Sequence, residues 1–217
     1  MSAAEGPAEG PVGGVAEGVA EGVAEGVAGW RARAGAVVER FDEAVDAQFD
    51  RLRGHRAIDR MFYSASALGE FGTIWVMLGA LRGLRGEHHW RAAVRVGAAV
   101  GIESVVVNVG VKSLFRRRRP VVDTPRPYPL RVPLTSSFPS GHATSAFCAA
   151  TLLADGDRAL APLYYAAATV VALSRIHVKI HHASDVVGGT VIGLCLGRLG
   201  RHLVPLEGRN ADRGRRR

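Results

Sequence analysis

The segment SRIHVKIHHASD, residues 174–185, combines side chains that can bind an anion and attack it. His181 and Asp185 are four positions apart. In a helix over residues 174–190 the carboxylate would therefore bind one imidazole nitrogen and present the other to a substrate. Arg175, six residues before His181, can bind two phosphate oxygens at once. The segment thus indicates a histidine that acts as a nucleophile or base on a phosphate group.

The same segment also contains candidate ligands for a metal ion. Three side chains share the four-residue spacing that zinc sites use: His177, His181 and Asp185. A zincin-type helix carries a glutamate directly after its first histidine, where this chain has Val178. Arg175 and Lys179 would also repel a cation. We therefore expect no metal and no cofactor, and we interpret His177 and His182 as ordinary interfacial or supporting residues.

A second group of cations lies in KSLFRRRRP, residues 112–120. A helix that ends at a membrane face would place Lys112 about two turns below Arg119, and Pro120 would turn the chain outward. The two cations would then converge on one anion. The alternative is that the arginine run 116–119 only anchors the helix to lipid headgroups.

The segment FPSGH, residues 138–142, precedes an apolar run and predicts the start of a helix. Ser140 is a good N-cap, which places Gly141 and His142 in the first turn, where free backbone N–H groups favour an anion. Gly141 allows the backbone to approach a ligand closely, and His142 can donate a proton to a departing oxygen.

Together the three motifs read Lys-x6-Arg-Pro, Pro-Ser-Gly-His and Ser-Arg-x5-His-x3-Asp, in that order. In this respect the chain resembles, over about residues 61–204, the type 2 phosphatidic acid phosphatase superfamily, which includes vanadium-dependent haloperoxidases. The resemblance implies that His181 attacks phosphorus, that Asp185 orients it and that His142 protonates the leaving group. It also implies that a set of phosphate-binding residues surrounds them: Lys112, Arg119, Ser140, Gly141 and Arg175.

Five apolar stretches supply the elements that must position these residues: 61–82, 92–114, 141–154, 159–174 and 185–204. The first two are long enough to cross a bilayer. The last carries Gly189, Gly193 and Gly197, a spacing that lets helices approach closely in lipid. Ionisable residues within the first two stretches, such as Glu70 and Glu103, indicate polar packing between helices. We predict an all-α, polytopic membrane helical bundle of about five spans over residues 61–204.

If all five stretches cross, the segment 112–142 and the segment 175–185 face the same side of the membrane. The six prolines of residues 120–139 forbid a regular helix and predict an ordered loop over that side. The basic residues between 82 and 95 and after 205 then lie on the opposite side, which the positive-inside rule makes cytoplasmic. We therefore expect an integral protein of a bacterial-type plasma membrane with an extracytoplasmic active site.

The flanks of this domain are polar. Residues 1–29 repeat VAEG and predict a disordered, low-complexity tail. Residues 30–60 contain an amphipathic helix and a linker. The apolar side chains of that helix recur every three or four residues: Val37, Phe41, Val45, Phe49 and Leu52. The helix either lies at the membrane interface or caps the protein. Residues 205–217 form a basic tail.

The chain has 217 residues, 47% of them hydrophobic, and a net charge of +8. Because the arginines gather beside apolar stretches, we expect anionic lipid rather than nucleic acid as their partner. The predicted function is hydrolysis of a lipid phosphate, of the phosphatidic acid or polyprenyl (di)phosphate type, through a phosphohistidine. The alternatives are a vanadate-dependent haloperoxidase-like enzyme and a catalytically silent lipid-binding protein. The sequence does not choose the lipid or the oligomeric state.

Overall fold

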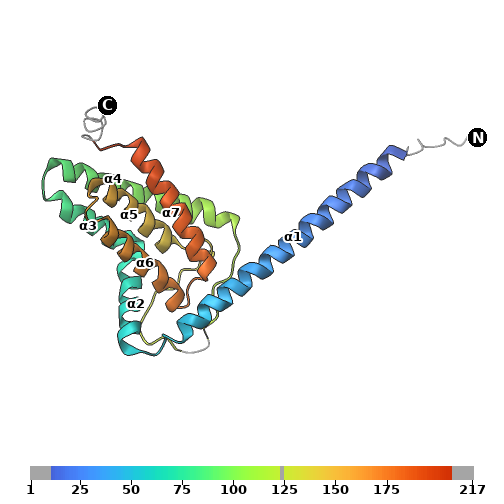
Figure 1. The fold of residues 1–217 in the computed structure, drawn as a ribbon, viewed down its shortest axis with the longest axis horizontal. Coiled ribbons are helices and arrows are strands. Elements are labelled where there is room, and N and C mark those ends of the chain that lie inside the picture. Colours follow the sequence, from blue (N-terminus) through green and yellow to red (C-terminus); the bar gives the residue numbers. More distant parts are fainter. Residues whose placement is uncertain (1–10, 123–124, 207–217) are drawn as a thin grey trace, which may run out of the picture. The chain divides into compact units, whose positions relative to one another are not determined.

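The computed structural model describes residues 11–122 and 125–206, and within them the chain contains helices and no strand (Figure 1). The prediction of an all-α fold is confirmed. The elements run in this order: α1 (Pro11–Asp50), α2 (Arg56–Leu68), η1 (Glu70–Gly72), α3 (Thr73–Gly83), α4 (Glu87–Val105), η2 (Val106–Gly110), η3 (Val111–Leu114), α5 (Gly141–Gly156), α6 (Ala161–His177) and α7 (Ala183–Leu203). Helix α1 begins in one compact unit, Met1–Glu43, and ends in the other, Ala44–Arg217, which holds all the other helices.

The N-terminal unit contains the predicted tail. Residues 1–10 lie outside the described residues, and residues 11–29 form the first part of α1. A helix with glycine at every fourth position is weak in water because glycine lowers helix propensity. The disorder of residues 1–29 therefore stays a prediction, as does the basic tail, whose residues from 207 onward are likewise outside the described part.

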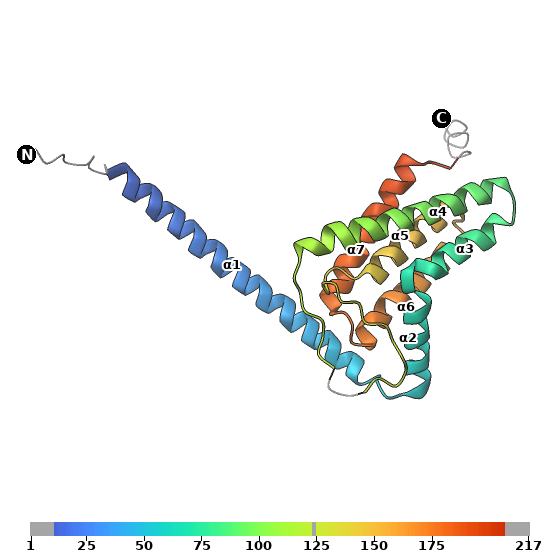
Figure 2. The same cartoon turned by 180° about the vertical axis from the view of Figure 1, so that it is seen from behind.

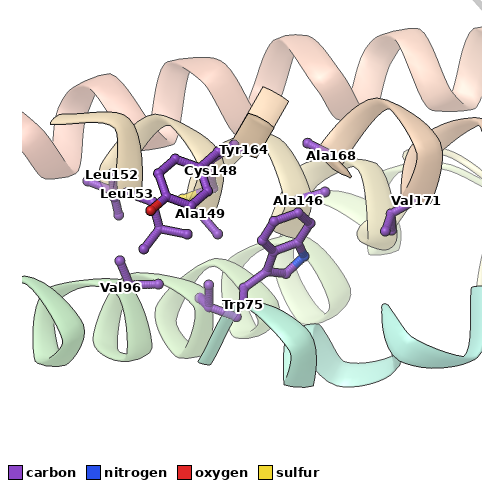
Figure 3. Packing of buried hydrophobic residues seen from close by; sticks show 12 residues of the cluster. Trp75, Val96, Ala146, Cys148, Ala149, Leu152, Leu153, Tyr164, Ala168 and Val171 are labelled. Atoms are coloured by element: carbon purple, nitrogen blue, oxygen red, sulfur yellow. The ribbon is translucent and has the colours of Figure 1, made fainter. Parts of the chain in front are cut away.

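Helix α5 lies at the centre of the C-terminal unit, with α4, α6 and α7 packed around it (Figures 1 and 2). Its sequence, GHATSAFCAATLLADG, is dominated by small and apolar residues, ten of its 16 residues are buried, and none is exposed. A helix that is apolar on all sides is suited to such a position. Trp75 of α3 and Tyr164 of α6 pack against it from two sides (Figure 3).

Close contact between α5 and α7 depends on the three predicted glycines. A Cβ atom on Gly193 would lie 2.3 Å from the carbonyl oxygen of Thr144, and one on Gly197 would lie 3.0 Å from that of Cys148. Gly189 meets the carbonyl oxygen of Ser140 at 2.5 Å in the same way. The glycine spacing therefore does permit the close helix packing that it predicts.

The first apolar stretch, predicted to continue from 61 to 82, is broken. It forms α2 and α3, which meet at an angle of 59° across η1. Phe71 and Gly72 have positive φ angles of 53° and 68°, which end one helix and start the next in a new direction. A Cβ on Gly72 would lie 2.6 Å from Val100 Cγ1, so the position also needs glycine for space.

Among the described residues, one helical segment, His89–Leu114, is by itself long and apolar enough to cross a bilayer. The bent pair of α2 and α3 passes the same test when taken as one span. Helices α5 and α6 have 16 and 17 residues and are shorter than an ordinary span. The number of five spans therefore stays a prediction.

The two ends of the bundle differ in character. At one end, buried arginines hold the helix termini together: Arg95 Nη1 lies 2.9 Å from Asp155 Oδ2, and Arg82 Nη1 donates to the carbonyl of Leu153 at 3.1 Å. Helix α5 begins, α6 ends and α7 begins at the other end (Figure 2). Residues of both chemical segments, Lys112 and Gly141 from one and Arg175 from the other, lie together there, whereas their side of the membrane stays a prediction.

Candidate active site

Most of residues 174–190 are helical, as predicted, but His181 itself lies in a turn between two helices, so it does not share a continuous helix with Asp185. Helix α6 ends at His177 and α7 begins at Ala183. Between them Lys179 has a positive φ of 51°, and the amide of His181 donates to the carbonyl of Arg175 at 3.1 Å. The turn still brings His181 Nδ1 to 3.6 Å from Asp185 Oδ2.

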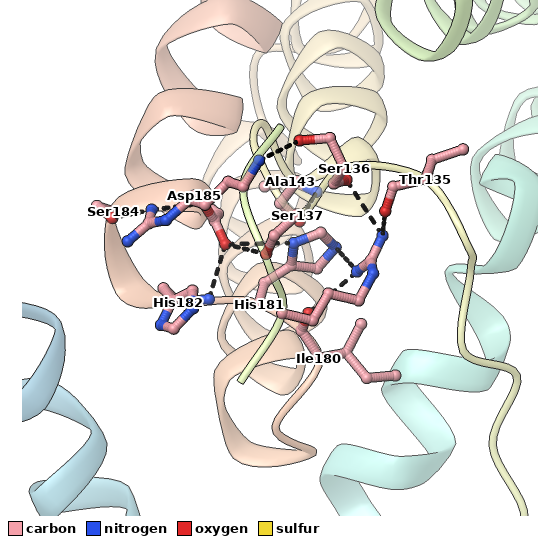
Figure 4. A network of polar contacts seen from close by, with 12 residues as sticks. Thr135, Ser136, Ser137, Ala143, Ile180, His181, His182, Ser184 and Asp185 are labelled. Carbon is pink, nitrogen blue, oxygen red and sulfur yellow. Dashed lines mark hydrogen bonds and ion pairs between the residues drawn. The ribbon is translucent and has the colours of Figure 1, made fainter. Parts of the chain in front are cut away.

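Asp185 is fully buried and receives more donors than the sequence indicates (Figure 4). Arg117 Nη1 lies 2.6 Å from Oδ1, while the Ser137 hydroxyl and the His182 amide, the latter at 2.8 Å, donate to Oδ2. These contacts fix the carboxylate beside the imidazole. Sequence reasoning missed Arg117, which is hidden in a run of four arginines, and Ser137, which belongs to no recognised motif.

The second ring nitrogen of His181 faces a cation. Arg119 Nη1 lies 3.3 Å from His181 Nε2. Because a guanidinium has no lone pair to offer, Nε2 must be the acceptor, and the ring proton then belongs on Nδ1, toward Asp185. At 3.6 Å that pair is longer than a hydrogen bond, a common state for catalytic contacts before substrate binds.

Burial, together with the positive charges of Arg175 and Arg119, lowers the pKa of His181 to about 4, against the opposing effect of Asp185. Burial likewise lowers the pKa of Arg119, although a guanidinium still stays charged at neutral pH. At neutral pH His181 is therefore an uncharged imidazole whose Nε2 carries the lone pair that attack on phosphorus requires.

Lys112 and Arg119 approach the site by different routes from the predicted one. The helix ends at Leu114, so residues 115–119 are not helical and Arg119 does not lie two turns above Lys112. Helix α4 widens into the π-helical segment η2 just before Lys112, a distortion that is frequent at functional sites. Arg119 is held by the carbonyls of Ile180 and Thr135, each at 3.0 Å.

The start of α5 matches the sequence prediction. Ser140 is the N-cap, and its hydroxyl accepts from the amide of Ala143 at 3.5 Å. The Gly141 backbone is open enough that a Cβ atom there would lie 3.8 Å from Lys112 Nζ. His142 Nε2 lies 3.1 Å from the carbonyl oxygen of Ser66 in α2.

These elements enclose a cavity of about 230 Å³. Five of the eight predicted site residues line it: Lys112, Gly141, His142, Arg175 and His181. Of the remaining three, Arg119 and Asp185 lie beside His181, and Ser140 caps the helix that carries Gly141 and His142. The cavity also contains two acidic side chains, Glu70 and Glu103, which sequence reasoning assigned to helix packing.

Among the lining residues, Arg175 gives the strongest indication of what the cavity binds. Its side chain is completely buried, and Nη1 donates to the Ser66 hydroxyl. Its Nε and Nη2 atoms have no hydrogen-bond partner within the described part of the chain. Buried polar groups are normally paired, and a guanidinium binds oxyanions with two parallel hydrogen bonds. The cavity is therefore built to receive an anion.

The turn that carries His181 is held from outside the cavity. Arg53 donates to the carbonyls of His177 and Ile176, both at 2.8 Å, and so caps the C-terminus of α6. His177 Nε2 lies 2.8 Å from Asp59 Oδ1 and therefore faces away from His181. Over residues 11–122 and 125–206, no three His, Cys, Asp or Glu side chains are grouped so that they could hold a metal ion.

Comparisons with known proteins agree with this geometry. The family model of the PAP2 superfamily matches residues 92–209. The decaprenylphosphoryl-5-phosphoribose phosphatase of Mycobacterium tuberculosis is 34% identical over 151 residues, which cover 65% of this chain and 81% of that protein. The enzyme of the same name from Mycolicibacterium smegmatis is 35% identical over 143 residues, or 64% of this chain and 71% of that protein.

A solved structure has a similar fold. It is the crystal structure of a transmembrane PAP2 type phosphatidylglycerolphosphate phosphatase from Bacillus subtilis. The two chains superpose with a TM-score of 0.58 over 80% of this chain and 89% of that one, at 23% sequence identity.

Proposed function

The chain belongs to the PAP2 superfamily, and we propose that it removes the phosphate of a lipid phosphomonoester through a phosphohistidine at His181. It is a phosphatase of this superfamily and a membrane protein. The observation that carries the proposal is the buried, half-unpaired guanidinium of Arg175 in a cavity shared by two imidazoles and Lys112.

The charges of the cavity suit phosphoryl transfer. A phosphomonoester carries nearly two negative charges, and the transition state spreads them over the three equatorial oxygens. Lys112 and Arg175 line the cavity, and the first turn of α5 adds the amide of Gly141. Fixed donors of this kind stabilise the developing charge without having to reorganise during the reaction.

The first step transfers the phosphoryl group to the protein. The lone pair of His181 Nε2 forms a bond to phosphorus, and the bond between phosphorus and the leaving oxygen breaks. That oxygen keeps the electron pair and takes a proton from the His142 imidazolium. Asp185 favours the positive charge that then develops on the phosphorylated His181 ring, since its carboxylate faces Nδ1.

The second step regenerates the enzyme. The neutral His142 accepts a proton from water as the water oxygen attacks phosphorus, and the bond from phosphorus to His181 breaks. Inorganic phosphate leaves, His181 returns to the neutral imidazole, and His142 is again protonated for the next substrate.

The size of the cavity favours a lipid whose phosphate alone enters it. About 230 Å³ is less than the roughly 300–1,000 Å³ that pockets for whole small ligands occupy, so the lipid chain must lie outside. The chain is 34% identical over 151 residues to the decaprenylphosphoryl-5-phosphoribose phosphatase of Mycobacterium tuberculosis. A polyprenyl-linked sugar phosphate is therefore the first substrate to test, followed by phosphatidylglycerol phosphate, phosphatidic acid and polyprenyl diphosphate.

The test is phosphate release from these four lipids by the purified, detergent-solubilised protein, with EDTA present. We expect hydrolysis of at least one lipid, and loss of that activity in His181→Ala. Brief reaction with a ³²P-labelled lipid should leave an acid-labile, base-stable label on the wild-type protein and none on the variant. Undiminished turnover by His181→Ala would refute the role of this residue.

We also propose that the active site faces away from the cytoplasm. Helix α7 runs from the site at Ala183 to the opposite end of the bundle at Leu203, beside the basic 82–95 region. Green fluorescent protein fused after residue 217 should therefore fluoresce, because it folds in the cytoplasm. A dark fusion, together with an active alkaline phosphatase fusion at the same position, would reverse the orientation.

A further inference from the structure

We propose that Glu70 is a positioning residue for His142: its carboxylate orients the imidazole and stabilises its protonated form. The inference rests on the proposed function, in which His142 protonates the leaving oxygen. Glu70 Oε2 lies 3.6 Å from His142 Nε2, and both residues line the cavity. The sequence analysis assigned Glu70 only to packing between helices.

The backbone around Glu70 is shaped to bring it to the imidazole. Glu70 opens η1, the break between α2 and α3, and Phe71 takes a positive φ that is uncommon for an aromatic residue. On the N-terminal side, a Cβ on Gly69 would lie 2.9 Å from His142 Cδ2. The break is therefore packed directly against the ring of His142.

The positive charges around His142 explain what a carboxylate beside its imidazole does. The positively charged or titratable groups that line the cavity with His142 include Lys112 of η3, Arg175 of α6 and His181 of the following turn. Positive charge on these groups opposes a proton on His142. Glu70 favours it, and so does the carbonyl oxygen of Ser66, at 3.1 Å from the same nitrogen.

Glu103, the other acidic residue of the cavity, acts on a different group. Glu103 comes from α4 and its charge acts on Lys112 rather than on His142. The site thus holds two imidazoles, each with its own carboxylate: His181 with Asp185, and His142 with Glu70, both at 3.6 Å. A nucleophile and an acid with separate partners can keep different protonation states at one pH.

A purely structural role for Glu70 would rest on its other contact. Its Oε1 atom lies 3.2 Å from Arg131 Nη1, and that guanidinium also stacks over the Phe71 ring at 4.8 Å. The Arg131 side chain is 61% exposed, and exposed ion pairs contribute little to stability. Loss of this pair alone therefore does not predict a large loss of catalysis.

The experiment compares two substrates that differ in their need for an acid. p-Nitrophenyl phosphate has a leaving group that departs without a proton, whereas a short-chain dioctanoyl phosphatidic acid has an alkoxide leaving group that requires one. We expect Glu70→Gln to lower kcat/KM at least about 10-fold on the alkyl phosphate and less than about 3-fold on the aryl phosphate, since a general acid contributes about 10²–10⁴-fold. His142→Gln should show the same pattern with a larger loss.

Two further variants separate positioning from structure. Glu70→Asp keeps the charge and should recover part of the lost activity on the alkyl phosphate. Thr73→Ala removes the hydroxyl that donates to the Glu70 carbonyl at 2.8 Å, so it disturbs η1 but keeps the carboxylate. It should leave kcat/KM on both substrates within about 2-fold of the wild type, because surface substitutions of this kind have small effects.

Equal losses by Glu70→Gln on both substrates, or no loss on either, would overturn the positioning role while leaving the proposed function intact. An unchanged rate in His181→Ala would instead overturn the proposed function, and this inference with it. The thermal unfolding temperature of each variant, measured in the same detergent, shows whether the comparison is made on folded protein.

Discussion

A methyl group at Gly189 should disable the enzyme, because at this position the packing of the bundle meets the active site. In Gly189→Ala the new Cβ would lie 2.5 Å from the carbonyl oxygen of Ser140, 3.1 Å from Ala143 Cβ and 3.2 Å from Thr144 Oγ1. Ser140 caps α5, and its amide donates to the carbonyl of Asp185 at 3.0 Å. The substitution therefore wedges the start of α5 away from the start of α7.

The size of the effect follows from that contact. An ordinary contact begins near 3.4 Å, so the Cβ is about 0.9 Å too close to a backbone oxygen that cannot rotate away. Overpacking of this kind costs about 1–3 kcal/mol of stability. A displacement of about 1 Å between reacting groups can cost about 100-fold in rate, so we expect kcat/KM to fall by that order.

The assay is phosphate release together with thermal unfolding in the same detergent. Gly193→Ala is the matched control, because its Cβ would meet Thr144 O at 2.3 Å, one helical turn farther from the site. It should destabilise at least as much as Gly189→Ala but lose less activity. Gly97→Ala, with no atom within 4 Å of the new Cβ, should be neutral or slightly stabilising. The reasoning fails if Gly189→Ala matches Gly97→Ala in both measurements.

Three further predictions concern the site and its support. The pKa of His181, lowered to about 4, keeps the nucleophile neutral above that pH, so the acid limb of log(kcat/KM), corrected for substrate ionisation, should lie near pH 4, while loss of the His142 proton gives a separate basic limb; an acid limb near 6.5 would contradict this. Asp185→Asn should lower the single-turnover rate by about 10³–10⁴-fold, as loss of an orienting carboxylate does elsewhere, and a loss below 10-fold would contradict the orienting role. Arg53→Met removes two donors to the C-terminal carbonyls of α6 and should lower the free energy of unfolding by about 2 kcal/mol. The control Arg51→Met, at an exposed contact, should change the free energy of unfolding little. Equal unfolding temperatures of the two variants would refute the capping role of Arg53.

The parts of the site that the sequence predicts well are those that local chemistry determines. Ser140 caps α5 because a hydroxyl followed by Gly141 and His142 satisfies the free amides of a first helical turn whatever the rest of the chain does. The glycines of α7 predict close packing for an equally local reason, because a residue without a side chain lets a neighbouring helix approach closely whatever surrounds it.

The turn at His181 could not be predicted from local sequence because residues distant along the chain determine it. Spacing alone favours a continuous helix from 174 to 190, in which His181 and Asp185 share a face. The helix ends early because Arg53 binds the carbonyls at the end of α6, and Arg126 binds those of Val178 and Lys179, at 3.3 and 3.2 Å. Neither arginine is close to the turn in sequence.

The break at Glu70 was missed for a different reason. Glycine is common in membrane helices, so Gly69 and Gly72 within an apolar stretch do not signal an interruption. What breaks the helix is contact: Gly69 packs on His142 and Gly72 on Val100, and neither contact can be read from the stretch itself. The carboxylate that the break presents was consequently interpreted as packing polarity.

The stability of the scaffold and the chemistry of the site are linked through the buried cations. Burying Arg175 without a partner for two of its nitrogen atoms is costly, and the neighbouring positive charges add repulsion. The fold can hold this arrangement only if the elements around it are tied elsewhere, as they are by the glycine contacts of α5 with α7 and by the Arg53 cap on α6. A phosphate that enters the cavity relieves the repulsion and pairs the free N–H groups. The same charge distribution that strains the bundle is therefore what binds the substrate and stabilises the transferring phosphoryl group.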